Sequence, residues 1–342
     1  MKRRHFLKQA VPAVSLIPVM GCAARSKNHR AKQVLPAGDI EKRALGTTGI
    51  DVSRLGFGSH LDWNKLGDQK NRDRLIRLGY EAGINLFDVY NREPYEQYIP
   101  MGNTVRDFRK DIVISLYGKP DPSQIQADFD NTLDVFHTDY IDLYRFYPIN
   151  DESITIAEKN RQAGKLRAIG VASHEMEQLD HYLDRYGETL DYVLLVYNFH
   201  HNKAVPEKNA EPHDYTDFFA RCDALNIGIL AMKPMGSDNM IKLARERGYF
   251  KRDDVNITHA MLSYVFSEER IASALSAMNT FSELASNLEA VHDPVLRDHE
   301  RERLKQLSVE ASSTQGAYLP DYYKWLENWS VPGVGIHDIQ QA

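Results

Sequence analysis

The sequence predicts a (β/α)8 barrel, and two observations indicate it. Short apolar, β-branched runs recur along the chain, and stretches with helical periodicity separate them. Alternation of strand and helix builds a parallel sheet covered by helices, and roughly eight such units close a barrel of about 250 residues. The expected strands span residues 54–59, 85–90, 111–118, 140–148, 166–173, 192–199, 227–235 and 271–278.

The stretches between these runs carry the helical signal. In DPSQIQADFDNTLDVFHT, residues 121–138, Ile125, Phe129, Leu133 and Phe136 recur at steps of three and four residues. A doubly wound open sheet is the alternative, and it is usually marked by a GxGxxG turn after the first strand. The corresponding segment here reads GFGSHLDWN and lacks that pattern, so the barrel is favoured.

Composition indicates a globular protein and argues against several functions. Of the 342 residues, 42% are hydrophobic and 26% are charged, which suits one large core. The formal net charge of −6 provides no basic surplus for binding nucleic acid. Cys22 and Cys222 are the two cysteines, so we expect no disulfide framework, and Cys222 lies in an apolar segment typical of a buried thiol. His200 and His201 would point to opposite sides of an extended segment, and no metal site is predicted.

The first 21 residues have the layout of a signal peptide. A basic start precedes an apolar stretch over residues 10–20, which is shorter than the roughly 20 residues that span a bilayer. Arg3 and Arg4 resemble a twin-arginine export signal, and VMGC at 19–22 resembles a lipobox, in which Cys22 would carry lipid. We therefore expect a protein anchored by lipid in the cell envelope and facing the periplasm. A basic N-terminal helix is the alternative.

Four segments follow from these patterns. Residues 1–21 form the signal peptide, 22–40 a polar tether, 41–292 the barrel and 293–342 a C-terminal region. The last region begins with a charged amphipathic helix and ends with an aromatic tail. We expect this tail to pack over the barrel or to rim its pocket, with a partner surface as the alternative. Its aromatic residues include Tyr322, Tyr323, Trp325 and Trp329.

In a barrel of this type the chemistry lies at the carboxyl ends of the strands. Polar and aromatic residues gather there, which suits a ligand site. Paired carboxylates are scarce, which argues against a glycosidase. The strand-end candidates are Asp88, Tyr90, Tyr117, Lys119, Tyr147, Ser173, His174, Asn198, Lys233 and Asn279.

Six segments of the chain resemble, in order, successive signatures of the aldo/keto reductase superfamily. Each segment alone is a weak match, but six in the right order are specific. They are LGTTGIDVSRLGFGS (45–59), EAGINLFD (81–88), DYIDLYRFYP (139–148), GKLRAIGVAS (164–173), IGILAMKPMG (227–236) and MNTFSELASNLEAV (278–291). The fold expected from this resemblance is again the barrel.

The resemblance implies that the barrel binds NADP(H), or NAD(H), and transfers hydride to a small carbonyl or sugar-like substrate. The family uses a tyrosine as general acid, and a lysine and an aspartate tune the pKa of that tyrosine. Asp88 matches the aspartate. Tyr95 is the preferred match for the acid, with Tyr90 as the alternative, because position 93, where the acid is expected, is a glutamate.

Two other positions of the family tetrad have become tyrosine. Tyr117 stands where the third strand normally ends in lysine, and Lys119 follows two residues later, where it could substitute. Tyr147 stands where a histidine normally orients the substrate. The two tyrosines either hydrogen-bond a polar substrate or fill the mouth of a pocket that no longer catalyses the reaction.

The cofactor side of the resemblance is better preserved. Ser173 and His174 match the pair near the nicotinamide carboxamide, although Asn is usual at the second position, and the alternative for Ser173 is a solvated strand-end serine. Further implied cofactor positions are Tyr197, which would stack on nicotinamide, Asn198, Lys233, Met278, Asn279 and Asn287. Asn287 would lie near adenine, or it is a helix-surface asparagine. No Arg or Lys occurs in 278–291 to bind a 2′-phosphate, so the choice of nucleotide stays open.

Two functions are therefore compatible with the sequence. The first is an exported oxidoreductase of the aldo/keto reductase family with a degenerate catalytic tetrad. Twin-arginine export carries folded proteins, which would allow a cofactor to be loaded before export. The alternative is a catalytically inactive, ligand-binding lipoprotein on the same barrel.

Overall fold

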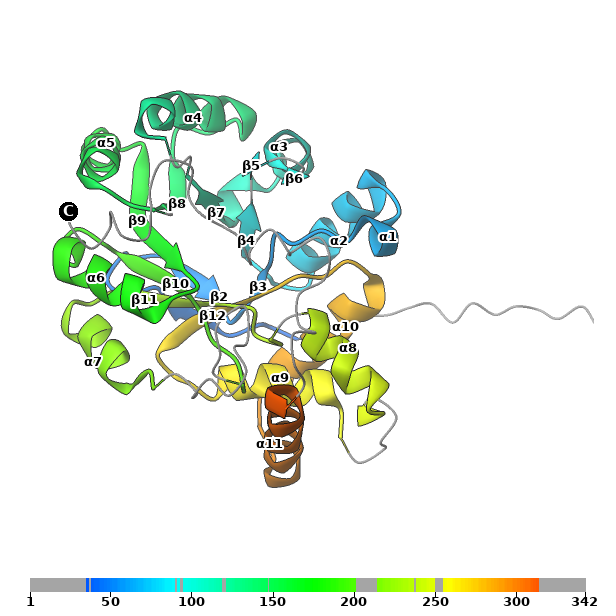
Figure 1. The fold of residues 1–342 in the computed structure, drawn as a ribbon. Coiled ribbons are helices and arrows are strands. Elements are labelled where there is room, and N and C mark those ends of the chain that lie inside the picture. Colours follow the sequence, from blue (N-terminus) through cyan, green and yellow to red (C-terminus); the bar gives the residue numbers. More distant parts are fainter. Residues whose placement is uncertain are drawn as a thin grey trace, which may run out of the picture. The chain divides into compact units, whose positions relative to one another are not determined.

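A computed structural model describes residues 35–36, 38–89, 91–92, 95–118, 121–146, 148–200, 214–236, 238–249 and 255–313. Within them, parallel strands close a barrel in the order β10-β11-β12-β3-β4-β7-β8-β9 (Figure 1). Each run expected as a strand contains one of these strands, so the predicted (β/α)8 barrel is confirmed. The strands are β3 (Leu55–Phe57), β4 (Leu86–Val89), β7 (Val113–Tyr117), β8 (Ile141–Phe146), β9 (Leu166–Ser173), β10 (Tyr192–Val196), β11 (Gly228–Met232) and β12 (Ile271–Ser276).

Helices surround the strands in Figure 1 and cover the outer face of the barrel. The segment expected to be helical from its periodicity forms α4 (Pro122–Val135), which Asp121 caps by accepting a hydrogen bond from the Ser123 backbone N–H. Its Ile125 and Phe129 are buried, as their spacing predicts. The other helices are α1 (Trp63–Leu66), α2 (Gln69–Glu81), α3 (Tyr98–Val105), α5 (Asp151–Gln162), α6 (Met176–Tyr186), α7 (Thr216–Ala224), α8 (Asp238–Glu246), α9 (Ile257–Phe266), α10 (Phe281–His292) and α11 (Asp298–Ser313).

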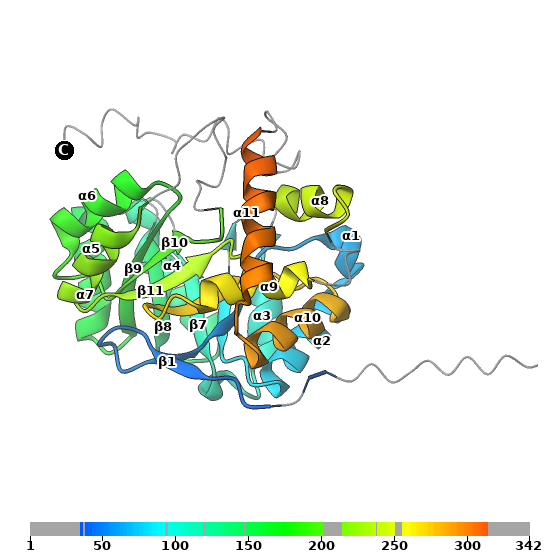
Figure 2. The same cartoon turned by 90° about the horizontal axis from the view of Figure 1, so that it is seen from below.

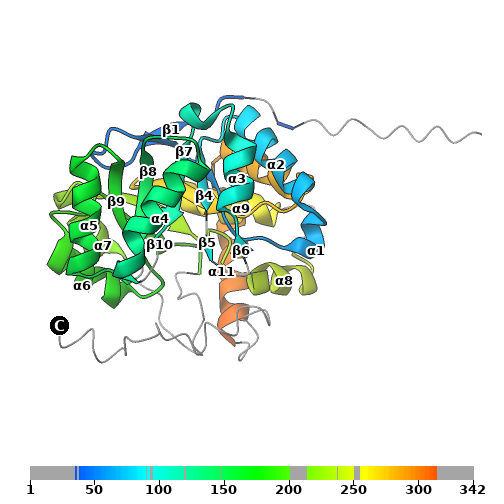
Figure 3. The ribbon, with the colours of Figure 1, turned by 90° about the horizontal axis from the view of Figure 1, so that it is seen from above.

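A β-hairpin closes the end of the barrel where the strands begin. Its strands, β1 (Lys42–Ala44) and β2 (Asp51–Ser53), pair antiparallel. Leu45, Ile50 and Val52 of the hairpin belong to the same apolar cluster as Leu86 and Val113 from the barrel interior. Figures 2 and 3 show β1 at one end of the barrel and α8 at the other. The hairpin therefore covers the end of the barrel where the strands begin.

Helix α11 packs against α8 and α9, as Figure 2 shows. Its Leu304, Leu307 and Ala311 are buried in an apolar cluster with residues of both helices. The charged amphipathic helix expected after residue 292 is therefore present. The aromatic tail beyond residue 313 lies outside the described residues.

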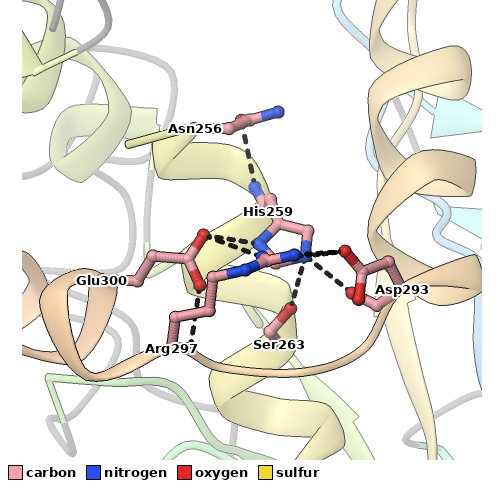
Figure 4. Close-up of polar contacts among 6 residues, drawn as sticks. All are labelled: Asn256, His259, Ser263, Asp293, Arg297 and Glu300. Atoms are coloured by element: carbon pink, nitrogen blue, oxygen red, sulfur yellow. Dashed lines mark hydrogen bonds and ion pairs between the residues drawn. The ribbon is translucent and has the colours of Figure 1, made fainter. Parts of the chain in front are cut away.

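An ionic arrangement joins α9 to the start of α11, and we call His259, Asp293, Arg297 and Glu300 the outer cluster (Figure 4). His259 Nδ1 lies 2.8 Å from Glu300 Oε1, and His259 Nε2 lies 2.6 Å from the Asp293 carbonyl oxygen. Both ring nitrogens therefore face oxygen atoms, one on α11 and one at the end of α10, and the ring is held between them. Arg297 Nη2 lies 2.5 Å from Asp293 Oδ2 and completes the cluster.

The folded part of the chain begins earlier than the sequence indicates. Leu35 packs against the core and Ile40 is buried in it, so contacts with the core begin at Leu35, within the segment expected as a tether. The expected signal peptide and Cys22 lie outside the described residues. Among the helices that the structure describes, none combines the length and apolarity needed to cross a membrane.

Candidate active site

The interior face of three neighbouring strands carries charge. Strand side chains alternate between the two faces of a sheet, so β4 directs Leu86 and Asp88 into the barrel, while Phe87 joins the core outside it. In register, Asp88 pairs with Ser115 of β7, and Tyr117 of β7 pairs with Arg145 of β8. An aspartate, a serine and an arginine therefore meet above the apolar layer that the hairpin closes.

Asp88 and Arg145 form a buried ion pair, which we call the inner pair. Arg145 Nη1 lies 2.6 Å from Asp88 Oδ1, and it donates to Ser115 Oγ at 2.7 Å. The second carboxylate oxygen, Asp88 Oδ2, accepts from Ser59 Oγ at 2.7 Å. The side chains of Arg145 and Asp88 are 0% and 5% exposed, so each charge depends on the other for compensation.

Aromatic rings border the inner pair. The guanidinium carbon of Arg145 lies 5.9 Å from the centroid of the Tyr117 ring, within the range of a cation–π contact. Tyr192 of β10 is also buried, and burial raises the pKa of its phenol while the nearby positive charge of Arg145 opposes that rise. Gly170 makes room for the Tyr192 ring, because a Cβ at this position would lie 2.3 Å from it. The charge on Arg145 is thus close enough to influence neighbouring phenols.

A second buried arginine lies close to Asp88. Arg72 of α2 stacks on Phe57, with its guanidinium carbon 4.6 Å from the ring centroid, and Nη2 donates to the Gly58 carbonyl at 3.3 Å. Burial lowers the pKa of Arg72 to about 10, and the charges of Asp73 and Asp88 oppose this. Arg72 therefore stays protonated at neutral pH and adds positive charge near the strand ends.

The predicted acid–base residues are described in part. Tyr117 is buried at the end of β7, and its carbonyl accepts from the Tyr98 hydroxyl at 3.2 Å. Tyr95 lies in the short strand β6 (Tyr95–Glu96), which pairs with β5 (Asn91–Arg92), but its side chain is not described. Gln97, two residues later, donates to the Ser59 carbonyl at 2.8 Å, which ties this segment to the end of β3. Tyr90, Lys119 and Tyr147 lie outside the described residues.

Three of the predicted cofactor residues meet at the ends of β9, β10 and β11. Burial and the positive charge of Lys233 hold the pKa of His174 well below its usual value, so the imidazole is neutral. Lys233 has a φ of 54°, a left-handed conformation that non-glycine residues seldom adopt and that is often found at functional sites. Asn198 Nδ2 donates to the Lys233 carbonyl at 3.2 Å and joins the two loops.

Ser173 is engaged at the start of α6. Its Oγ donates to Gln178 Oε1 at 2.6 Å and accepts from the Glu175 backbone N–H at 3.0 Å. These contacts bind the hydroxyl within its own loop. A role in holding a carboxamide would require the hydroxyl to exchange one of these partners.

The structure places Tyr197 differently from the prediction that it stacks on nicotinamide. Because Tyr192, Leu194 and Val196 occupy the interior phase of β10, the next residue points outward to the helices. The Tyr197 ring packs on Tyr264 of α9 with centroids 5.8 Å apart, and burial raises its pKa to about 12. The ring therefore belongs to the core between the barrel and its helices.

At the start of α10 the predicted phosphate site contains a carboxylate. Thr280 caps the helix by accepting from the Glu283 N–H, and the Asn279 N–H donates to Glu283 Oε2 at 2.8 Å. Lys65 Nζ lies 3.2 Å from Glu283 Oε1, and Asn279 Oδ1 accepts from the Asp62 N–H at 3.0 Å. The helix N-terminus already has an anionic partner in Glu283.

Two further predicted residues are buried. Met278 is packed in the core, and Asn287 Nδ2 donates to Ser276 Oγ at 2.8 Å. Asn287 therefore braces α10 against β12 and is not a surface residue. In the described part of the chain, no group of three or more His, Cys, Asp or Glu side chains could hold a metal ion.

Sequence reasoning missed Arg145, Ser59, Ser115 and Arg72. Arg145 had a readable signal, because alternation within LYRFY puts it on the same face as Leu143 and Tyr147. A lone arginine on the interior face of a barrel strand needs a buried partner to compensate its charge. Its pairing with Asp88 could be recognised only from the structure, which shows that β4, β7 and β8 are neighbours.

Comparison with known proteins supports this reading of the fold. A model of the aldo/keto reductase family matches residues 54–253. The uncharacterized oxidoreductase YqkF of Bacillus subtilis (strain 168) is 24% identical over 307 residues, covering 78% of this chain and 96% of YqkF. L-galactose dehydrogenase of Arabidopsis thaliana is 22% identical over 308 residues, covering 79% of this chain and 94% of the relative.

A solved structure shows the same fold. The aldo-keto reductase AKR11C1 from Bacillus halodurans, known in apo and holo forms, matches with a TM-score of 0.60 at 21% identity, over 78% of this chain and 96% of that one. The family model spans more than half of this chain, and the eight strands form the barrel that the match implies. The chain therefore belongs to the aldo/keto reductase family.

Proposed function

We propose that this protein is a nicotinamide-dependent oxidoreductase that reduces the carbonyl group of a small, polar or sugar-like substrate. The observation that carries the proposal is Asp88 at the carboxyl end of β4, fixed inside the barrel by Arg145 and Ser59. Burial of a charged centre costs stability, and a role in ligand binding or catalysis at this end of the barrel would explain why it is present. L-galactose dehydrogenase among the relatives favours a sugar-like substrate.

The residues of the chain would supply the proton and the orientation. When bound, the dinucleotide supplies the hydride that reaches the carbonyl carbon, and the carbonyl oxygen then takes a proton from a tyrosine hydroxyl. Tyr117 lies beside the inner pair, and Tyr95 lies in the segment that Gln97 ties to β3. The resulting phenolate would be stabilised by buried positive charge and would regain its proton from solvent.

The described residues fit a dinucleotide without a 2′-phosphate better than one with it. The family resemblance implies that the adenosine phosphate would lie near Asn279 and Thr280, and the carboxylate of Glu283 accepts from the Asn279 N–H there. Lys65 is already paired with this carboxylate, so its charge is partly neutralised. A phosphate would be repelled by Glu283, whereas a ribose hydroxyl could donate to it. Of the two nucleotides that the sequence left open, we therefore favour NADH.

The carboxamide end would lie near His174 and Lys233. The neutral imidazole of His174 can accept or donate a hydrogen bond, and Lys233, in a left-handed backbone conformation, begins the loop after β11. Both groups come from strand ends, where the family binds its cofactor. They are the described residues best suited to hold the nicotinamide amide.

A direct test begins with the full-length protein purified in folded form. After denaturation, mass spectrometry of the supernatant would measure released NAD(H) or NADP(H). The protein would then be assayed with NADH and NADPH against a panel of aldoses, sugar lactones and small α-dicarbonyls. We expect dinucleotide-dependent turnover that falls about 100-fold or more in Asp88→Asn.

The oxidoreductase function would be refuted if the purified protein contains no dinucleotide, binds none that is added and shows no turnover on the panel. That result would favour the ligand-binding alternative. Glu289→Gln, an exposed substitution on α10, serves as the control. It should bind dinucleotide and turn over as the unmodified protein does.

We also propose that the mature protein is attached to the envelope membrane through lipid on Cys22, after twin-arginine export. The support is the order of a basic segment, a short apolar segment and VMGC in residues 1–22. Growth with radiolabelled palmitate should label the protein, and Cys22→Ala should abolish the label and release the protein into the soluble periplasmic fraction. An unlabelled protein in the cytoplasmic fraction would contradict this proposal.

A further inference from the structure

The inner pair raises the question of where the active site obtains its positive charge. The third barrel strand, β7, ends in Tyr117, where the family resemblance leads one to expect a lysine. Next to it, β8 directs Arg145 into the barrel in register with Tyr117. Arg145 is fully buried, and its guanidinium contacts Asp88, Ser115 and the ring of Tyr117.

We propose that Arg145 is a positioning residue for carbonyl reduction: delivered from the neighbouring strand, it orients Asp88 and supplies the fixed positive charge beside Tyr117. The proposal rests on the proposed function, because it assigns a role within that reaction. Arginine suits the role, since its guanidinium stays charged even when buried and can bind two partners at fixed angles.

The geometry supports orientation of the carboxylate. One Asp88 oxygen lies 2.6 Å from Arg145 Nη1, and the other accepts from Ser59 Oγ at 2.7 Å. An ion pair at one oxygen and a hydrogen bond at the other therefore limit rotation of the carboxylate. Ser115 accepts from the same Nη1 at 2.7 Å and fixes the guanidinium in turn. A group held in this way keeps its charge in one place during a reaction.

The field of Arg145 also reaches tyrosine hydroxyls. Its positive charge acts to lower the pKa of both Tyr98 and Tyr192, against the larger effect of burial, which raises them. Tyr117 lies in register with Arg145, and its ring is 5.9 Å from the guanidinium carbon. In a low-dielectric interior, a positive charge beside the ring stabilises a phenolate more strongly than it would in water.

A purely structural role explains the inner pair poorly. Barrel interiors are normally filled with branched apolar side chains, and an apolar replacement of a buried ion pair is often as stable or more stable. The same strand provides a structural comparison, since Asp142 lies on the opposite face of β8. It pairs at 2.7 Å with Arg109 and at 2.7 Å with Arg167, near the start of β8 and away from the carboxyl ends of the strands.

The test replaces Arg145 by Gln and by Lys, with Arg109→Gln as the matched control for loss of a buried arginine. Proteins labelled with 13C at tyrosine Cζ would be titrated by NMR, with the Tyr117 signal assigned through Tyr117→Phe. We expect the midpoint of Tyr117 titration to rise by about one pH unit or more in Arg145→Gln. It should stay near its original value in Arg145→Lys and in Arg109→Gln.

Steady-state kinetics form the second readout. We expect kcat to fall about 100-fold in Arg145→Gln with the Kd for dinucleotide changed less than about threefold, and Arg145→Lys to restore most of the loss. The alkaline limb of the kcat profile should move in the same direction as the NMR midpoint. If Arg145→Gln does not fold, the double variant Asp88→Asn/Arg145→Gln removes both charges, and Asp88→Asn alone then serves as its reference.

The two proposals can fail separately. If the unmodified protein shows no turnover on any substrate, the proposed function fails, and the NMR titration still measures the effect of Arg145 on Tyr117. If Tyr117 titrates at the same pH with and without Arg145, or if kcat and its pH profile are unchanged in Arg145→Gln, the role assigned to Arg145 is overturned.

Discussion

The inner pair and the outer cluster are both buried ionic arrangements, but different surroundings hold them. The inner pair links β4 to β8 across the strand between them, β7, and its two side chains are 0% and 5% exposed. The outer cluster joins two helices and extends from buried His259 and Glu300 to Arg297 and Asp293, which are 44% and 52% exposed. One arrangement is closed off from water, while the other has one face in water.

This difference indicates what each arrangement is for. The outer cluster holds α11 against α9 and so protects the apolar contacts of Leu304 and Leu307, which is sufficient reason for its presence. The inner pair is not needed to hold two elements together, because the hydrogen bonds of the barrel already join β4, β7 and β8. Burial of its charges is costly, which points to a role in chemistry.

The largest expected effect comes from breaking the inner pair on one side. Asp88→Leu leaves Arg145 buried without its carboxylate, and it should lower the free energy of unfolding by about 3–5 kcal/mol. The double variant Asp88→Leu/Arg145→Met removes both charges and should recover most of that loss without recovering activity. Urea unfolding measures the stabilities, and dinucleotide-dependent turnover measures the activity. A double variant as unstable as the single one would indicate that the inner pair is mainly structural.

The second largest effect is expected in the outer cluster, where a substitution should lower stability and leave activity unchanged. Glu300→Gln weakens the contact with His259 and should lower the free energy of unfolding by about 1–3 kcal/mol, with kcat/KM unchanged. Hydrogen exchange should show lost protection across α11, Asp298–Ser313, and little change in the barrel strands. Glu302→Gln, an exposed substitution on the same helix, is the control. Unchanged protection in α11 would show that apolar packing alone holds this helix.

A smaller effect is expected at the barrel mouth, where Glu283 occupies the start of α10. Glu283→Gln keeps an acceptor for the Asn279 N–H but removes the negative charge. The preference for NADH over NADPH should fall about tenfold, which corresponds to about 1.4 kcal/mol. Fluorescence titration with both dinucleotides measures it, with Glu289→Gln as the matched control. An unchanged preference would place the 2′ position of the ribose away from α10.

The smallest effect is a pH dependence at His174. Burial and Lys233 lower the pKa of His174 in the folded protein, so below about pH 6.5 the unfolded chain binds a proton that the folded chain does not. Stability should therefore fall as the pH drops below about 6.5, by at most about 1.4 kcal/mol per pH unit from this group. His174→Asn should flatten the decline between pH 7.5 and 5.5. Parallel stability curves for the two proteins would contradict this assignment.

The barrel was predictable because each strand has a recognisable local sequence pattern. Each β-branched run contains a strand, and α4 follows the spacing of Ile125 and Phe129. The hairpin β1–β2 was not predicted, since its first strand, Lys42–Ala44, is polar and partly exposed and carries no apolar run. Its apolar residues Leu45 and Ile50 lie in the turn between the strands, where periodicity is not informative.

The site was predictable only where one residue carries its own signal. Asp88 follows a buried strand and matches a family motif, and the structure places it inside the barrel. Tyr197, which the resemblance implied would stack on nicotinamide, packs on Tyr264 of α9, and YVLLVY is apolar throughout and does not reveal which phase points inward. The partner of Arg145 depends on the contact between strands distant in sequence, which no local pattern contains.

The central claim is that the inner pair serves catalysis while the outer cluster serves stability. Its most direct test measures kcat/KM and the free energy of unfolding side by side for Asp88→Leu/Arg145→Met and for His259→Leu/Glu300→Leu. We predict that the inner double variant stays within about 2 kcal/mol of the unmodified protein but loses about 100-fold or more in kcat/KM, and that the outer double variant keeps its activity. An inner double variant with full activity would contradict the account.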